Sequence, residues 1–419
     1  METGVVVLAL LVLLFGVVSR PIERSILTAP MVFTAAGLLL GATGSGLIEV
    51  DLDGEVVSIL TEATLGLVLF SDAARINLGR LRADAALPAR MLGSLPLVIL
   101  LGAGAAALLL PDLSLFEAAV LAAVLAPTDA ALGQAVVTDE RLPTRVRQTL
   151  NVESGLNDGI VLPFVTIFLG LAGAEEGVSS VGSAAGFVGA QVGGGVGVGV
   201  VVGSLGAWMI DRASQRGWMT GSFQQLSALA VAVLCVVGAE GIGGNGFIAA
   251  FVGGMAFGTL AQQHCAGVQE LAEEEGTLLT LLVFALLGAA LVPQQLQALD
   301  LSTALYVVLS LTVVRMVPIA LSLAGAGLRR DTVAFLGWFG PRGLATVLFA
   351  LLVVERVEVA GRDRIVSVAL WTVLASIVAH GMSAVPLVGV YSRRLAASSP
   401  DDHADMPEMA PTVEFPTRG

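Results

Sequence analysis

Long apolar stretches recur along the whole chain, separated by short polar or charged segments. An α-helix needs about 17–25 residues to cross the hydrocarbon core of a bilayer, and most of these stretches reach that length. The pattern therefore predicts an all-α polytopic membrane protein with about thirteen transmembrane helices. The predicted spans are residues 3–19, 25–44, 56–76, 87–110, 115–138, 145–173, 182–210, 223–242, 244–261, 275–292, 304–327, 331–354 and 364–391.

Composition narrows the class of protein further. The 419 residues are 56% hydrophobic and only 13% charged, whereas a soluble domain carries about 25% charged residues. A formal net charge of −13 argues against nucleic-acid binding. The chain has neither a Walker A sequence nor a glycine-rich nucleotide loop, and its two cysteines and three histidines are scattered. The sequence therefore predicts no nucleotide, no cofactor and no resident metal cluster.

Arginine gathers in alternate loops. If the N-terminus lies outside, the cytoplasmic loops carry fifteen arginines and the outer loops carry three. Because positive residues mark the cytoplasmic side, the asymmetry predicts a plasma-membrane protein with an outer N-terminus and a cytoplasmic C-terminus. The transmembrane domain is predicted at residues 1–395, followed by a short, acidic, disordered tail at 396–419. The fifteen are Arg20, Arg24, Arg75, Arg80, Arg82, Arg90, Arg141, Arg145, Arg147, Arg212, Arg216, Arg329, Arg330, Arg393 and Arg394.

One polar motif, Pro127-Thr128-Asp129, lies near the middle of the fifth span. A proline inside a helix removes one backbone hydrogen bond. In a membrane, such a break survives only where protein or a water-filled cavity satisfies the freed groups. The break would place carbonyl and hydroxyl oxygens beside the Asp129 carboxylate, which suits a hard cation. A proline kink with a locally bonded aspartate is the simpler alternative.

A second polar motif lies in the sixth span. Glu153 and Asn157 are four residues apart, as are Ser154 and Asp158, so all four side chains share one face of a helix. An ionisable group at bilayer depth costs at least about 2.5–3.5 kcal/mol and normally persists only where it is paired or lines an ion path. A polar network that only holds helices together is the alternative, but carboxylates are a costly choice for that task.

Two arginines also lie inside predicted spans. Arg315 falls in the eleventh span and Arg342 in the twelfth, where Gly340 and Pro341 interrupt the helix. A buried guanidinium stays protonated and needs an anion or a polar cavity. The fifth and twelfth spans therefore both contain breaks, in matching positions if the chain forms two repeats. Paired broken helices point to an ion site near the middle of the membrane.

The ordered set of motifs resembles the monovalent cation/proton antiporters of the NhaP/NHE branch. The set comprises Pro-Thr-Asp, Glu-Ser-x-x-Asn-Asp, the eleventh-span arginine and Gly-x-Arg-Gly, and the stretch 243–250 is similar as well. The resemblance covers about residues 5–391. It implies an NhaA-like fold with two inverted repeats, crossed broken helices and a homodimer in lipid. Core helices would cover about residues 87–173 and 304–391, and the other helices would form a scaffold.

The same resemblance implies a cation site on the two motifs. Asp158 would be the carboxylate that exchanges a proton for a cation. Asp129, Thr128 and Ser154 would supply further oxygen ligands for Na⁺, and Asn157 would brace the unwound helices.

Supporting roles follow in the same way. Glu153 would form a buried ion pair with Arg315, and Arg342 would support the site from the other broken helix. The chain departs from the family at two positions: Ala130 stands where many relatives have proline, and Asp72 stands where relatives often place a glutamate facing the site.

The implied function is electroneutral 1:1 exchange of Na⁺ or Li⁺ for H⁺ by competition at Asp158, which makes the protein a transporter and not an enzyme. K⁺/H⁺ exchange is the alternative, since hard oxygen ligands suit both cations. A cation channel would need the same polar groups but no proton coupling. An intramembrane aspartyl protease is disfavoured because the chain lacks Gly-x-Gly-Asp and Tyr-Asp sequences.

Overall fold

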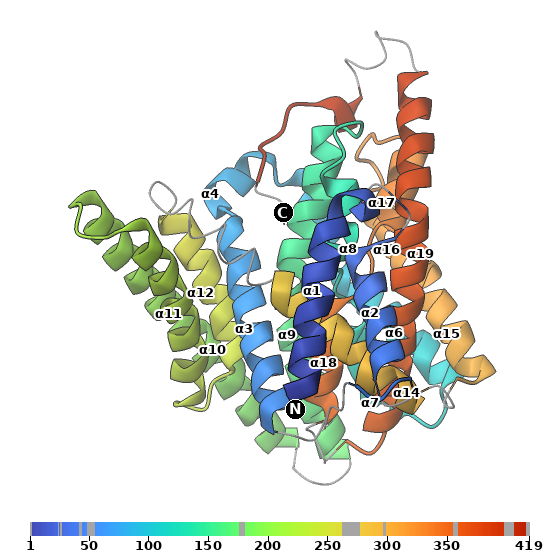
Figure 1. Cartoon of the computed structure of the whole chain (residues 1–419), viewed down its shortest axis with the longest axis horizontal. Coiled ribbons are helices and arrows are strands. Elements are labelled where there is room, and N and C mark those ends of the chain that lie inside the picture. Colours follow the sequence, from blue (N-terminus) through green and yellow to red (C-terminus); the bar gives the residue numbers. More distant parts are fainter. Residues whose placement is uncertain are drawn as a thin grey trace.

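The chain forms a bundle of helices, some of them continuous and some broken (Figure 1). The computed structural model describes residues 2–415, except 24, 26, 42–43, 48–54, 176–180, 262–276, 296–298, 355–358 and 398–405. The helices are α1 (Glu2–Glu23), α2 (Ala29–Leu40), α3 (Glu55–Arg75), α4 (Leu78–Leu81), η1 (Arg82–Asp84), α5 (Ala86–Gly93), α6 (Leu95–Leu109), α7 (Leu115–Val124), α8 (Ala130–Val137), α9 (Thr144–Glu175), α10 (Val181–Gln215), α11 (Gly221–Glu240), α12 (Gly246–Leu260), the π-helix η2 (Leu287–Leu291), α14 (Val292–Gln295), α15 (Leu301–Leu311), α16 (Val313–Ser322), α17 (Arg330–Trp338), α18 (Leu344–Val354), α19 (Arg362–Ala396) and η4 (Pro407–Met409).

The helices agree with a multi-pass membrane protein. Six are long and apolar enough to cross a bilayer, and shorter apolar helices, such as Thr277–Leu291, lie among them. The six are Ala86–Leu109, Thr144–Glu175, Ala185–Gln215, Gly221–Glu240, Leu301–Ser322 and Arg362–Ala396. The predicted all-α polytopic class is therefore confirmed, whereas the count of thirteen spans and the inverted repeats stay predictions.

Figure 1 shows α10, α11 and α12 beside α3 on one side of the bundle. Small residues make this packing possible. A Cβ atom at Gly254 or Gly258 of α12 would overlap the α3 backbone at Phe70 or Ala74, and a Cβ atom at Gly203 of α10 would overlap the α12 backbone. Because lipid provides no hydrophobic drive for helix association, such close backbone approach supplies the van der Waals contact that holds the helices together.

Ionic contacts tie the elements together at both ends of the bundle. One end of the bundle, called the arginine-rich end, carries Arg80, Arg82, Arg145 and Arg147 in α4, η1 and the start of α9. There, Arg145 of α9 pairs with Asp84 of η1 at 2.8 Å. At the opposite end, Arg364 of α19 lies 2.8 Å from Asp300 and 3.3 Å from Asp112. Asp300 also begins α15 by accepting the Thr303 N–H at 2.7 Å. The hydrogen bond from Thr303 and the nearby Arg364 lower the pKa of Asp300 to about 2.

Several elements differ from the predicted spans. The second span was predicted at residues 25–44, but α2 has only 12 residues. The glycine-rich α10 is one continuous helix of 35 residues. In the tail, predicted to be disordered, residues 406–415 instead carry η4 and pack against the helices. The rest of the predicted tail from 398 onward, and residues 262–276, lie outside the described residues.

Candidate cation-binding site

Two interrupted helices cross at the centre of the candidate site. The break between α7 and α8 covers residues 125–129, and the break between α17 and α18 covers 339–343. The Asp129 N–H donates to the Pro341 carbonyl at 2.8 Å, so the two extended segments touch. Each break leaves helix ends with unpaired backbone groups that need partners. The positions of Pro127, Gly340 and Pro341 agree with the breaks predicted from the sequence.

Asp129 caps two helices at once. Its Oδ2 accepts the Leu344 N–H of α18 at 2.6 Å, and its Oδ1 accepts the Leu132 N–H of α8 at 3.4 Å. Negative charge is favourable at a helix N-terminus because the helix dipole is positive there. A Cβ atom at position 343 would overlap the Asp129 carboxylate, so Gly343 is required for this contact. The carboxylate is therefore held by the backbone of both broken helices.

Arg342 places a positive charge near a helix C-terminus, whereas Asp129 places a negative charge at helix N-termini. Its Nη1 donates to the carbonyls of Ala126 and Pro127 at 2.8 and 2.9 Å. These carbonyls follow the C-terminus of α7, where a cation is favourable. The guanidinium is fully buried, and its Nε and Nη2 have no hydrogen-bond partner among the described residues. Asp129 and Arg342 thus compensate the ends of the interrupted helices with opposite charges.

The polar face of α9 meets the first break. Asn157 Nδ2 donates to Thr128 Oγ1 at 2.6 Å, and Thr128 Oγ1 lies 3.1 Å from Ser154 Oγ. Asp158 follows Asn157 and is 7% exposed, one helical turn from Ser154. The structure therefore brings hydroxyl, amide and carboxyl groups from two sequence motifs together, in agreement with the shared face expected from their spacing.

Glu153 and Arg315 form a bidentate ion pair. The two N–O distances are 2.5 and 2.8 Å, and both side chains are buried. The pair joins α9 to α16, and a Cβ atom at position 340 would overlap the Arg315 guanidinium. Gly340 therefore does more than interrupt its helix, because it also leaves room for the pair.

Asp72 lies on α3 rather than within the crossing. It is buried, and its Oδ1 is 3.5 Å from Nη2 of Arg75 in the same helix. Its backbone carbonyl packs toward Gly155 of α9, 3.7 Å from where a Cβ atom of that residue would lie. Asp72 is thus next to the helix that carries the second motif, on the side of the bundle that contains α10 to α12.

Two functional candidates on α19 were missed from the sequence. Ser376 Oγ accepts the Arg342 N–H at 2.6 Å. The ring nitrogens of His380 lie 3.0 Å from the carbonyl oxygens of Trp338 and Ser376, and the ring stacks on Trp338. Both contacts hold the break between α17 and α18 in place. The available signal was a serine and a histidine four residues apart in an apolar span, and hence on one helical face.

The donor set suits a hard cation better than a resident transition metal. Within the described ranges, no three His, Cys, Asp or Glu side chains gather as ligands. Hydroxyl, carbonyl and carboxylate oxygens are the ligands that hard cations prefer.

Comparison with known proteins identifies the family. Residues 6–390 match the family model described as "Sodium/hydrogen exchanger, transmembrane". The chain belongs to the sodium/hydrogen exchanger family. The resemblance expected from the motifs is confirmed, and because this is a family of transporters and not of enzymes, the protease alternative is excluded.

Curated relatives of this chain are K⁺/H⁺ antiporters, whereas a solved structure similar to it is a sodium proton antiporter. The chain is 26% identical to the K⁺/H⁺ antiporter NhaP of Alkalimonas amylolytica over 77% of its length, and 24% identical to the K⁺/H⁺ antiporter NhaP2 of Shewanella sp. strain MR-4 over 84%. These matches cover 55% and 61% of the relatives, so the chain spans little more than half of their length.

The fold is that of a solved family member. The sodium proton antiporter MjNhaP1 from Methanocaldococcus jannaschii, at pH 8, superposes with a TM-score of 0.77 at 19% identity. The match covers 95% of this chain and 99% of that one. At this identity the likeness establishes the fold of the sodium/hydrogen exchangers for this chain and leaves its transported cation open.

Proposed function

We propose that this chain exchanges a monovalent cation for a proton across the membrane, with Asp158 as the group that binds the two in turn. The observation that carries the proposal is the meeting of the α9 polar face with the crossing of two broken helices. There, Thr128, Ser154 and Asn157 form one hydrogen-bonded cluster beside buried Asp158. Such groups at bilayer depth are retained where they line an ion path.

Competition at one carboxylate couples the two fluxes. When Asp158 is ionised, its oxygens, with the hydroxyls of Thr128 and Ser154, bind the cation. When Asp158 takes a proton, the negative charge is lost and the cation leaves. If the site opens to one side of the membrane at a time, each cation that crosses is exchanged for a proton moving the other way.

We further propose that the exchange is 1:1 and moves no net charge. Asp129 is a second carboxylate, but its oxygens accept backbone N–H groups at two helix N-termini, where a negative charge is stabilised. Asn157 has no proton to give at physiological pH. We therefore expect Asp129 to stay charged throughout the cycle, so that only Asp158 carries a proton.

The identity of the curated relatives favours K⁺ as the cation that this chain transports. The sequence motifs suggested Na⁺ or Li⁺ first and K⁺ as the alternative. The curated relatives named above are K⁺/H⁺ antiporters and match 77–84% of this chain, so the alternative now has the better support. We also keep the homodimer, the division into core and scaffold, and the plasma-membrane orientation with a cytoplasmic C-terminus as proposals.

The test is an exchange assay in proteoliposomes containing a pH-sensitive dye. We expect K⁺ gradients to drive proton movement more strongly than Na⁺ or Li⁺ gradients, and Asp158→Asn to abolish it while the protein stays folded. An imposed membrane potential should leave the final cation gradient unchanged. Normal exchange by Asp158→Asn would refute the proposed role of Asp158, and cation flux without proton movement would favour a channel.

A further inference from the structure

The C-terminal segment Met406–Phe415 crosses the arginine-rich end of the bundle. Figure 1 shows this segment running from the side of α19 across the bundle, so that the end of the described chain lies beside α4. This segment is acidic and contains prolines, yet Phe415 is 7% exposed and belongs to the main hydrophobic core. It is therefore part of the packed molecule.

One end of the segment is anchored to three helices. The Pro407 carbonyl accepts a hydrogen bond from Arg145 Nη1 of α9 at 2.7 Å. Glu408 is fully buried, and its Oε1 accepts the Thr332 hydroxyl of α17 at 2.8 Å. That hydroxyl also lies 2.9 Å from the Tyr391 hydroxyl of α19. The anchor thus holds α9, α17 and α19, all of which belong to the predicted core.

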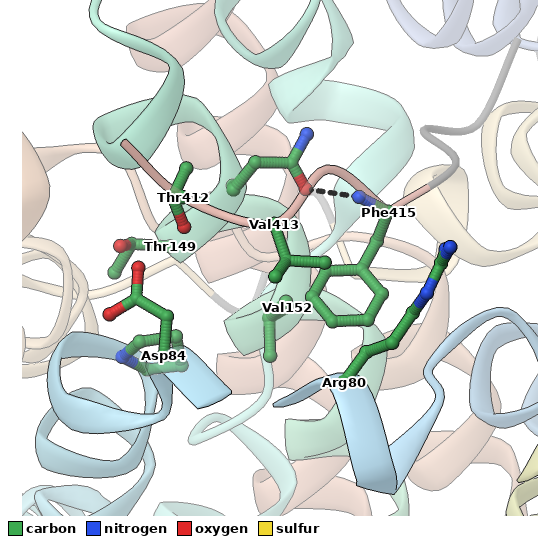
Figure 2. Close-up of a pocket in the computed structure, with 9 residues that line it drawn as sticks. Arg80, Asp84, Thr149, Val152, Thr412, Val413 and Phe415 are labelled. Carbon is green, nitrogen blue, oxygen red and sulfur yellow. Dashed lines mark hydrogen bonds between the residues drawn. The ribbon is translucent and has the colours of Figure 1, made fainter. Parts of the chain in front are cut away.

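The other end fills a crevice between two groups of helices (Figure 2). The Phe415 N–H donates to Gln148 Oε1 of α9 at 2.9 Å. The crevice is lined on one side by Gln148, Thr149 and Val152 of α9, and on the other by Arg80 of α4, Asp84 of η1 and Pro88 of α5. With the tail in place about 10 Å³ of space is left, which is about what a single water requires.

The crevice lies close to Asp158, the proposed ion-binding residue, along helix α9. Val152 is six residues before Asp158, which corresponds to about 9 Å along α9. The elements α4 and η1 directly follow α3, in the part of the chain expected to form the scaffold. The tail therefore lies between a scaffold element and the helix that carries the proposed ion-binding aspartate. In this position the tail opposes movement of α9 against α4 and η1, and it limits the entry of water between them.

The anchor contains a feature that weakens it. Glu408 Oε2 is buried and has no hydrogen-bond partner among the described residues. A buried polar atom without a partner opposes burial of its group. The segment is thus held by a few hydrogen bonds and the apolar side chains of Met406, Val413 and Phe415, against one unsatisfied carboxylate oxygen. This balance suits a contact that opens and closes.

We propose that Met406–Phe415 is an inhibitory plug, which seals the arginine-rich end of the transporter and must be released for exchange to run at full rate. The inhibitory part rests on the proposed function, whereas the seal itself can be tested without transport. The occupant of the crevice is the chain's own tail, so the proposal needs no other partner.

The test compares two aspartate substitutions in the same segment of the full chain. Phe415→Asp places a charge in the crevice, whereas Met409→Asp places it at a side chain that is 40% exposed. In a background with Cys235→Ala and Cys265→Ala, Thr149→Cys introduces a thiol into the α9 wall of the crevice. A water-soluble thiol reagent then reports how often the tail leaves.

We expect Phe415→Asp to accelerate labelling about tenfold, the factor that corresponds to about 1.4 kcal/mol, and to raise the exchange rate in vesicles several-fold. Met409→Asp should change neither. Unchanged labelling would overturn the seal, and faster labelling without faster exchange in an active protein would overturn inhibition. Slower exchange together with reduced thermal stability would instead make the segment a structural brace. If the unmodified chain exchanges no cation while labelling still accelerates, the proposed function fails and the seal stands.

Discussion

The α3–α10–α12 side of the bundle and the crossing of the broken helices are both tightly packed, but by different means. On the first side, glycines allow backbones to touch, and no charged side chain of α10, α11 or α12 is buried among the described residues, although α3 carries the buried pair Asp72 and Arg75. At the crossing, five charged side chains are buried: Asp129, Glu153, Asp158, Arg315 and Arg342.

The difference shows what close packing alone can achieve. Helices α10, α11 and α12 pack together without a buried charged side chain among the described residues, so close backbone contact is enough to join these three helices. At the crossing, interrupted helices leave backbone ends that only charged or polar groups can satisfy. Charges are therefore expected where the protein needs irregular backbone inside the membrane, and such backbone is tolerated only where protein buries it or where it lines a water-filled cavity.

The largest effect is expected from Glu153→Gln at the crossing. The substitution leaves Arg315 as an uncompensated buried charge, which costs on the order of 3–5 kcal/mol. We expect a clear fall in thermal stability in detergent, with the preference among K⁺, Na⁺ and Li⁺ unchanged in any protein that remains folded. A variant as stable as the unmodified chain would show that the pair is not a structural element.

A smaller effect is expected from Ser376→Ala. It removes the acceptor of the Arg342 N–H and leaves a buried donor unsatisfied, at a cost of about 1–3 kcal/mol. Because this contact positions the break between α17 and α18, the apparent affinity for the cation should fall as well as the stability. Ser367→Ala is a matched control, since that serine lies on the same helix, is buried, and has no hydrogen-bond partner within the described residues. Equal effects of the two variants would contradict a positioning role.

The smallest effect is expected at an exposed ion pair, Asp300 with Arg364. Asp300→Asn keeps a good helix cap and removes only the charge, so the loss should be below about 1 kcal/mol. Because the pKa of Asp300 is lowered in the folded protein, to about 2, its stabilising effect is present at neutral pH. That effect is lost as the pH falls from the usual aspartate range toward about 2. The melting temperatures of the unmodified chain and of Asp300→Asn, measured across this pH range, should become equal at the acid end. A difference in melting temperature that persists there would exclude the charge of Asp300 as the cause of the difference.

Some of this architecture could be predicted from the sequence, because its causes are local. Apolar length places the six long spans, Pro127 and Gly340 with Pro341 place the breaks, and helical spacing puts the polar residues of α9 on one face. The family resemblance added the Glu153–Arg315 pair, whose members are far apart in the sequence.

Other parts depend on contacts that no local pattern contains. The capping of α18 by Asp129 joins residues 215 positions apart, and Arg342 reaches the carbonyls of another helix. The tail was predicted to be disordered from its acidic composition, yet Phe415 finds a crevice that exists only after α9 and η1 have come together.

The most direct test of the central claim is proton release on cation binding. Purified protein in a weakly buffered, dye-containing solution is titrated with K⁺ at constant ionic strength, and Asp158→Asn is titrated in parallel. Competition at Asp158 predicts about one proton released per cation bound by the unmodified chain, and no release by the variant. Cation binding without proton release, or equal release by Asp158→Asn, would contradict exchange at this carboxylate.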